Sequence, residues 1–188
     1  MLSYIERINN LIRAFNPELK TAFEQITKIR TYAKGEFLLK QGQICRKSFL
    51  LITGVAHKYY QYEGKIISTE LYFKDDLALA FHSYTLQEPS KETIKAITEV
   101  VVSELAYDDF QILKLKYPAV VVLDLMITEY YAVWLENRLF QFYTQTARSR
   151  YLQILEKSPH ILQYIPLTIL AAYLGISLET LSRIRAKT

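Results

Sequence analysis

The sequence is poor in cysteine, since Cys45 is the only thiol among its 188 residues. A single thiol excludes a disulfide framework within the chain and is typical of a protein from a reducing compartment. Long uninterrupted apolar runs are also missing, because Asp124 and Glu129 interrupt the most apolar stretch, residues 119–135, and make it a poor membrane span. Residues 1–15 mix charged and apolar side chains as an amphipathic helix does, unlike a signal peptide. We therefore expect a soluble cytoplasmic protein.

Signatures of enzymes and of metal centres are missing as well. The sequence contains no P-loop, nucleophile elbow or dinucleotide-binding fingerprint. Its three histidines, His57, His82 and His160, are scattered without the spacing of metal ligands. A lone histidine is more often structural, and a haem-ligand role for His57 or His82 is the alternative. We predict that the chain is not an enzyme and holds no metal and no cofactor. Binding of a small-molecule effector of unknown identity is left open by the sequence.

Glycine is scarce and unevenly placed, because four of the five glycines lie between residues 35 and 64. Strand-like runs flank these glycines, and two further runs follow them. The predicted strands cover residues 36–40, 48–52, 55–62, 66–73, 93–97 and 100–105. Short strands separated by turn residues favour a β-roll or jelly-roll barrel. Helices are predicted before it, over 4–14 and 17–28, and after it, over 107–117, so the expected fold class is α+β.

A longer helix is predicted after Pro118, ending near residue 143. Apolar residues recur along it with the alternating spacing of four and three that is typical of a coiled-coil seam. The seam positions are Ala119, Leu123, Met126, Tyr130, Val133, Asn137 and Phe140. The pattern predicts a dimerisation helix, in which Asn137 is the polar member that can set the register. The alternative is that the stripe packs only on the chain's own barrel, and we expect both contacts.

The last 23 residues, 166–188, predict two short helices joined by a tight turn. Leu167, Leu170, Ala171 and Leu174 form one apolar helical stripe. Gly175 follows that stripe, where a helix ends in a left-handed residue. Ser177 can then cap the next helix by accepting from its free N–H groups. Leu181 and Ile184 are expected to face inward. This layout is typical of a DNA-binding helix-turn-helix.

The charge distribution favours a polyanion as the partner of this end of the chain. Residues 144–188 contain six basic and two acidic residues, whereas residues 1–143 contain 17 of each and are neutral. A positive end on a neutral body suits nucleic acid. The alternative is an ordinary helical hairpin with a solvated charged face. The predicted domains are a sensor domain over 1–117, a dimerisation helix over 118–143 and a helix-turn-helix domain over 144–188.

The order of these elements resembles the Crp/Fnr superfamily of bacterial transcription regulators over nearly the whole chain. Residues 32–36 (YAKGE), Gly42 and residues 49–54 (FLLITG) are similar to the opening strands of the family's cyclic-nucleotide-binding barrel. Residues 147–151 (ARSRY), 171–176 (AAYLGI) and 181–185 (LSRIR) are similar to its DNA-binding end. The resemblance implies a homodimer that binds a two-fold site on double-stranded DNA. RNA polymerase is a further partner that it suggests.

Base-reading roles follow from the resemblance for Glu179 and Arg183. An arginine can donate two hydrogen bonds to guanine, and a glutamate can accept from cytosine. Leu178 stands where the cAMP receptor has an arginine, so the recognised sequence is expected to differ. Phosphate contacts are more typical of Thr180, Ser182 and Lys187. Together with Ser177, these residues complete the predicted DNA-binding set. We expect the family's β-hairpin wing to be short or missing.

The effector pocket departs from the pattern that the resemblance implies. Members that bind cyclic nucleotide have a Gly-Glu pair and an Arg-Ser or Arg-Thr pair. Here Asp75-Asp76 and Ser90-Lys91 align with them, so the phosphate-binding arginine is missing. The predicted pocket set also includes Leu77 and Thr93. We expect an effector other than cAMP, or a vestigial pocket. The alternative for the whole chain is a ligand-binding or protein-interaction module that does not bind specific DNA.

Overall fold

The computed structural model describes residues 2–157 and 161–187. It divides into two compact units. The first combines Met1–Lys28 with Leu105–Gln145, and the second combines Ile29–Glu104 with Thr146–Thr188. The boundaries of these units differ from those of the predicted domains 1–117, 118–143 and 144–188. Each unit combines one segment from the first half of the sequence with one from the second half. The three-domain division stays a prediction.

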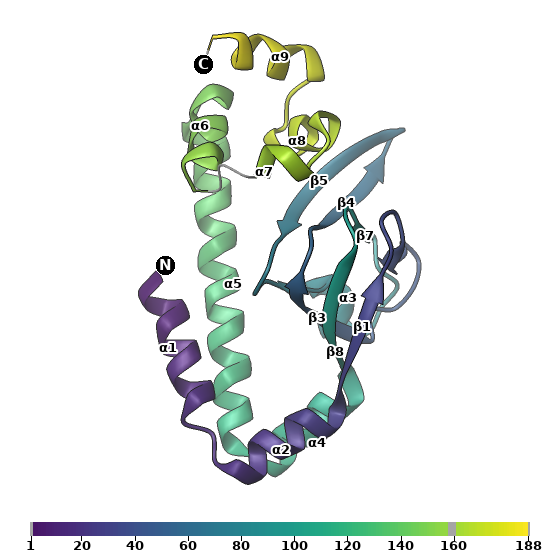
Figure 1. The fold of residues 1–188 in the computed structure, drawn as a ribbon, viewed down its shortest axis with the longest axis vertical. Coiled ribbons are helices and arrows are strands. Elements are labelled where there is room, and N and C mark those ends of the chain that lie inside the picture. Colours follow the sequence, from purple (N-terminus) through teal and green to yellow (C-terminus); the bar gives the residue numbers. More distant parts are fainter. Residues whose placement is uncertain (1, 158–160, 188) are drawn as a thin grey trace. The chain divides into compact units, whose positions relative to one another are not determined.

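The first unit is helical. It contains α1 (Leu2–Arg13), α2 (Pro17–Ile26), α4 (Tyr107–Lys116) and α5 (Pro118–Thr144). The side chain of Asn16 caps α2 by accepting from the N–H of Leu19, 2.8 Å away, and Pro17 occupies the first turn, where no N–H is needed. Figure 1 shows α1 running alongside α5. Their shared core contains Phe15, Leu19, Phe110, Leu113, Val120 and Leu123.

The second unit contains two four-stranded sheets (Figure 1). One has the strand order β1-β8-β3-β6 and the other β2-β7-β4-β5. The strands are β1 (Thr27–Tyr32), β2 (Phe37–Leu39), β3 (Lys47–Thr53), β4 (Ala56–Tyr62), β5 (Lys65–Tyr72), β6 (Leu77–Ala78), β7 (Thr93–Ala96) and β8 (Val100–Ala106). A short helix, α3 (Phe81–Leu86), lies between β6 and β7 in sequence. Side chains such as Phe49, Leu51, Ile94 and Val102 form the core that the two sheets share.

The α+β class and six of the eight strands were predictable, and β1 and β6 were not. The predicted helix over 17–28 is wrong at its end, because α2 stops at Ile26 and β1 begins at Thr27. The hydroxyl of Thr27 donates to the carbonyl of Phe23, 2.9 Å away, and so closes the last helical turn. Only Tyr32 in β1 is buried, so the strand carries no apolar alternation that a sequence could reveal. Strand β6 has two residues, too few for any pattern.

The remaining helices belong to the same compact unit as the sheets. They are α6 (Ala147–Lys157), α7 (Ile161–Tyr164), α8 (Leu167–Leu174) and α9 (Leu178–Ala186). Helix α8 packs against β5. Leu170 and Leu174 of α8 and Leu181 of α9 are fully buried in one cluster with Val55 and Ile97 of the sheet region. Burial of these apolar side chains fixes the helix pair on the β structure.

Candidate functional site

The turn between α8 and α9 has the predicted local structure. Gly175 has φ +69°, and its N–H points to the carbonyls of Ala171 and Ala172. The hydroxyl of Ser177 accepts from the N–H of Thr180, 3.1 Å away, and so caps α9. The axes of the two helices differ by 97°. A left-handed glycine followed by a serine cap therefore produces a sharp, well-defined turn.

Helix α9 has one inner and one outer face. Leu181 is buried and Ile184 half-buried, as the spacing predicted. All the side chains that the sequence analysis assigned to DNA binding are exposed. These are Ser177, Leu178, Glu179, Thr180, Ser182, Arg183 and Lys187. The structure thus brings the predicted set together on one surface.

The two predicted base-reading residues contact each other in this structure. Arg183 Nη2 donates to Glu179 Oε1 across one helical turn, and both side chains are about three-quarters exposed. An exposed pair at this spacing contributes only about 0.3–0.5 kcal/mol, so a competing ligand can separate it.

Two arginines of α6 have roles that the sequence did not reveal. Arg148 Nη2 donates to the carbonyl of Lys187, 3.1 Å away, at the end of α9. Arg150 Nη2 donates to the carbonyl of Leu174, 2.8 Å away, at the end of α8. Carbonyls at a helix C-terminus lack intrahelical partners and carry partial negative charge, which a guanidinium satisfies. In the sequence, both arginines count among the charges that can attract a polyanion. In the structure, they also hold the ends of α8 and α9 in place.

The predicted effector residues come from two segments of the chain, one leading into β6 and one around β7. Asp75 lies in the turn between β5 and β6 with φ +71°, and the Asp76 carboxylate accepts from the N–H of Phe73, 2.8 Å away. Leu77 pairs with Leu50 in β3. These three residues shape a turn and the start of β6.

The other predicted effector residues lie around β7. Ser90 is buried, and its hydroxyl bonds both the N–H and the carbonyl of Glu92, at 3.0 and 2.9 Å. The hydroxyl of Thr93 accepts from the N–H of Gln41, 3.2 Å away. Lys91 is exposed. Ser90 bonds the backbone of Glu92 and so reaches the polar network of the interior.

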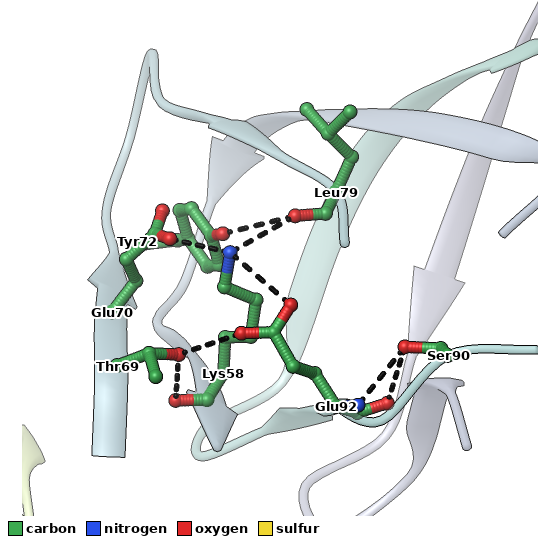
Figure 2. A network of polar contacts seen from close by, with 7 residues as sticks. All are labelled: Lys58, Thr69, Glu70, Tyr72, Leu79, Ser90 and Glu92. Atoms are coloured by element: carbon green, nitrogen blue, oxygen red, sulfur yellow. Dashed lines mark hydrogen bonds and ion pairs between the residues drawn. The ribbon is translucent and has the colours of Figure 1, made fainter. Parts of the chain in front are cut away.

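The centre of that network is Lys58, which is only 1% exposed (Figure 2). It faces Glu70 in the register of β4 and β5 and forms an ion pair with it. Its ammonium also lies 3.7 Å from a carboxylate oxygen of Glu92 and 3.3 Å from the carbonyl of Leu79. A charge this deeply buried is tolerated only with close partners.

Neighbouring hydroxyls extend the network. The Tyr72 hydroxyl donates to the carbonyl of Leu79 over 3.4 Å, and the Tyr72 ring lies 6.0 Å from the Lys58 ammonium. The Thr69 hydroxyl contacts the Glu92 carboxylate at 3.2 Å (Figure 2). The sequence did not reveal this network. The only hint in it was Lys58, a charged residue within the predicted strand 55–62.

The network has more carboxylates than ammonium groups. Burial raises the pKa of Glu92, and the Lys58 charge only partly offsets that rise. Burial also raises the pKa of Asp76, although the N–H of Phe73 lowers it, and repulsion from Glu70 and Asp75 adds to the rise. The interior therefore offers an ammonium that already has two carboxylate partners, which is a poor environment for a further anion.

The two described histidines, His57 and His82, lie in different environments. His57 is buried and lies 2.7 Å from the Ser68 hydroxyl, and burial, with a smaller effect of Lys95, lowers its pKa to about 4. His82 is exposed and lies 3.6 Å from Glu88, whereas His160 falls outside the described residues. Within residues 2–157 and 161–187, no group of three His, Cys, Asp or Glu side chains could hold a metal ion.

The β domain is similar to a known family. Residues 29–117, slightly less than half of the chain, match the family described as "Cyclic nucleotide-binding domain". The sequence matches no curated protein.

Solved structures show the same fold over most of the chain. The Thermus thermophilus catabolite activator protein is 22% identical, with 94% of this chain and 85% of that chain covered and a TM-score of 0.56. FixK2 from Bradyrhizobium japonicum is 18% identical, with coverages of 86% and 84% and a TM-score of 0.72. The c-di-GMP-responsive global regulator CLP of Xanthomonas campestris is 14% identical, with coverages of 92% and 91% and a TM-score of 0.70.

The class of protein follows from the match and the fold together. The chain contains a cyclic-nucleotide-binding-like β domain and a long helix, and solved structures of similar fold include Crp/Fnr-type regulators. At identities below 25% the likeness to these structures establishes the fold, so DNA, ligand and partner are argued from the residues themselves.

Proposed function

We propose that this protein is a DNA-binding transcription regulator of Crp/Fnr type. The observation that carries the proposal is the outer face of α9, where polar and basic side chains lie together beyond a capped, sharply bent turn. Such a helix can enter the major groove while its inner face stays packed. Glu179 and Arg183 are the base-reading residues, and Thr180, Ser182 and Lys187 contact phosphates.

The chain acts as a homodimer through α5. Leu123, in the first half of the predicted seam, is buried in the chain's own helical core, and Tyr130 stacks on Tyr4 of α1. The second half of the seam is exposed at Val133, Asn137 and Phe140. Other exposed apolar side chains of α5 are Val121, Val122, Leu125, Leu135, Leu139, Phe142 and Tyr143. A surface this apolar is typical of an interface, and a second copy of α5 would cover it.

A membrane location is the competing explanation for α5. By length and composition alone, α5 could cross a membrane. The bent pair of α8 and α9 could do so as well if it counted as one span. Length and composition are weak evidence for a membrane span. Two polar contacts inside the helical unit argue against it. Asp124 lies 2.8 Å from the Lys114 ammonium, and Tyr4 donates to Glu129. We propose a protein interface and a cytoplasmic protein, with RNA polymerase as a further partner.

The effector of the barrel is a small molecule other than cAMP. A cyclic phosphate needs a cation, and Ser90 stands where the resemblance implies an arginine. Lys58 does not replace it, because Glu70 and Glu92 already surround its ammonium. Entry of a further anion would leave buried carboxylates without their cation. Thermal shift measurements with cAMP test this point, since stabilisation at micromolar concentration would contradict it.

Selection of bound sequences from a random pool of double-stranded DNA tests the proposed function. We expect enrichment of a palindrome whose half-sites are about one helical turn apart. Lack of any enriched motif at low salt would reject the proposal. It would favour the alternative, a ligand-binding or protein-interaction module without sequence-specific DNA binding. The packing of α8 against β5 is the observation that favours that alternative.

A further inference from the structure

Basic residues cluster at one place in the β domain, away from the candidate DNA-binding helix. Residues 28–47 contain six basic side chains and one acidic side chain. The basic residues are Lys28, Arg30, Lys34, Lys40, Arg46 and Lys47, and the acidic residue is Glu36. Residues 1–143 as a whole are neutral, so this charge is concentrated locally. This local positive charge makes the segment a candidate site for an anionic ligand.

A groove opens within this basic segment. Its volume is about 580 Å³, within the range of small-molecule sites. Apolar side chains of the barrel core form part of its lining, among them Leu39, Cys45 and Phe49, all nearly inaccessible to solvent. Arg30 and Arg46 are exposed and line the same groove. Apolar side chains and guanidinium groups lining one groove are a combination that can hold an organic anion.

Not all cations of the groove are available. The Lys47 ammonium lies 2.7 Å from the Glu104 carboxylate, which also accepts from the Tyr32 hydroxyl. Burial alone would raise the pKa of Glu104. The hydrogen bonds from Lys47 and, to a smaller extent, Tyr32 outweigh that effect and lower the pKa. Glu104 therefore offsets Lys47. The Glu36 carboxylate accepts from the N–H of Ala33, 2.9 Å away.

Two guanidinium groups remain. Neither Arg30 nor Arg46 forms an ion pair with any part of the chain that the structure describes. Arg30 is held with its guanidinium carbon 5.4 Å from the centre of the Tyr32 ring. Stacking on a ring orients the planar donors of an arginine without using them. Among the lining side chains, Arg30, Arg46 and Lys47 outnumber Glu36, and with Glu104 offsetting Lys47 the groove still has an excess of positive charge.

We propose that this groove binds a small organic monoanion with an apolar body. Its carboxylate or sulfonate group would accept from Arg30 and Arg46, and its apolar part would lie against the exposed Phe37 ring that lines the groove. The excess of positive charge suits a negatively charged ligand. The site is separate from the Lys58 network, none of whose members lines the groove. It also stands independently of the proposed DNA binding.

The test uses two fluorescent probes that differ by one anionic group. 8-Anilinonaphthalene-1-sulfonate has a sulfonate, and N-phenyl-1-naphthylamine is the same body without it. Titrated into the full chain, the sulfonate probe is expected to bind at one site. Arg46→Ala and Arg30→Ala should each weaken it about tenfold, the loss of one charge-assisted contact, and leave the uncharged probe unchanged. Octanoate should displace the sulfonate probe.

Lys65→Ala is the matched control, because Lys65 is an exposed cation at the start of β5 and does not line the groove. It should leave both probes unaffected. The proposal is overturned if neither arginine variant weakens the sulfonate probe, or if Lys65→Ala weakens it equally. Equal loss of both probes in the arginine variants would likewise overturn it, because the anionic group would then contribute nothing. Each outcome is independent of the DNA selection.

Discussion

Arg150 of α6 donates from Nη2 to the carbonyl of Leu174, 2.8 Å away, where α8 ends and the turn toward α9 begins. This side chain thereby connects α6 to Leu174, the last residue before the turn at Gly175. Because α9 follows only a few residues later, its direction depends on this contact. The orientation of the proposed recognition surface is therefore set from outside the helix pair.

Replacing Arg150 should loosen the turn. Arg150→Met keeps the aliphatic part of the side chain but leaves the Leu174 carbonyl without the guanidinium. We expect a loss of about 1–2 kcal/mol in the free energy of unfolding, measured with urea. Arg185→Met is the control, because Arg185 is an exposed cation of α9. Equal effects of the two variants would contradict a specific role for Arg150.

Replacing Lys58 should be far more damaging. Lys58→Met leaves Glu70 and Glu92 buried without their cation, and breaking a buried ion pair in this way costs about 3–5 kcal/mol. The double variant Lys58→Met/Glu70→Leu should recover most of that loss, since it removes the charge left behind. Chemical denaturation of both variants measures the difference. A double variant no more stable than the single one would show that Glu70 is not the main partner.

The buried His57 should make the fold sensitive to acid. Its pKa is lowered to about 4 from an ordinary value of 6.5, chiefly by burial. The folded state therefore favours the neutral ring, and His57 contributes stability above pH 6.5 that is lost as the pH falls toward 4. The loss should not exceed about 3 kcal/mol. His57→Gln, compared with the native chain in urea denaturation from pH 7 to pH 4.5, should show a shallower decline. Parallel curves would contradict this origin of the sensitivity.

Arg183 should carry base specificity. Arg183→Ala is expected to relax one position of the recognised sequence at about 1–3 kcal/mol, measured by binding to a set of single-base operator variants. Glu179→Ala removes the ion-pair partner of Arg183 but leaves the guanidinium in place, so it should change preference at a different position. A uniform loss across all sequences in Arg183→Ala would indicate a phosphate contact instead.

The exposed half of α5 should form the dimer. Phe140 is 63% exposed, and Phe140→Glu places a charge on the predicted seam. We expect the native chain to sediment as a dimer at micromolar concentration and Phe140→Glu as a monomer. Leu115→Glu is the control, because Leu115 of α4 is 89% exposed and lies off the seam. A native monomer, or dissociation by both substitutions, would reject the assignment of the seam.

Local sequence signals proved dependable where chemistry and spacing act over a few residues. The turn at Gly175, the cap at Ser177 and the inward position of Leu181 all follow from rules about helix ends and helical period, and the structure confirms them. Strand β1 escaped prediction because five of its six residues are not buried, so its sheet neighbours and not its own pattern make it a strand. The spacing of four and three along α5 was visible, but periodicity alone could not divide the stripe into a half covered by the chain and an exposed half. Its role as a dimer seam stays a prediction.

By itself, the sequence determined the α+β class, the helix-turn segment and the charge of its outer face, because these depend on contacts between near neighbours. Tertiary structure alone decided the partners of Lys58, which come from β5 and from the residues before β7. It also decided that Arg148 and Arg150 close the ends of α9 and α8, and that Arg30 and Arg46 share a groove. A charge is visible in a sequence. Whether another part of the chain neutralises it depends on distances that only the fold sets.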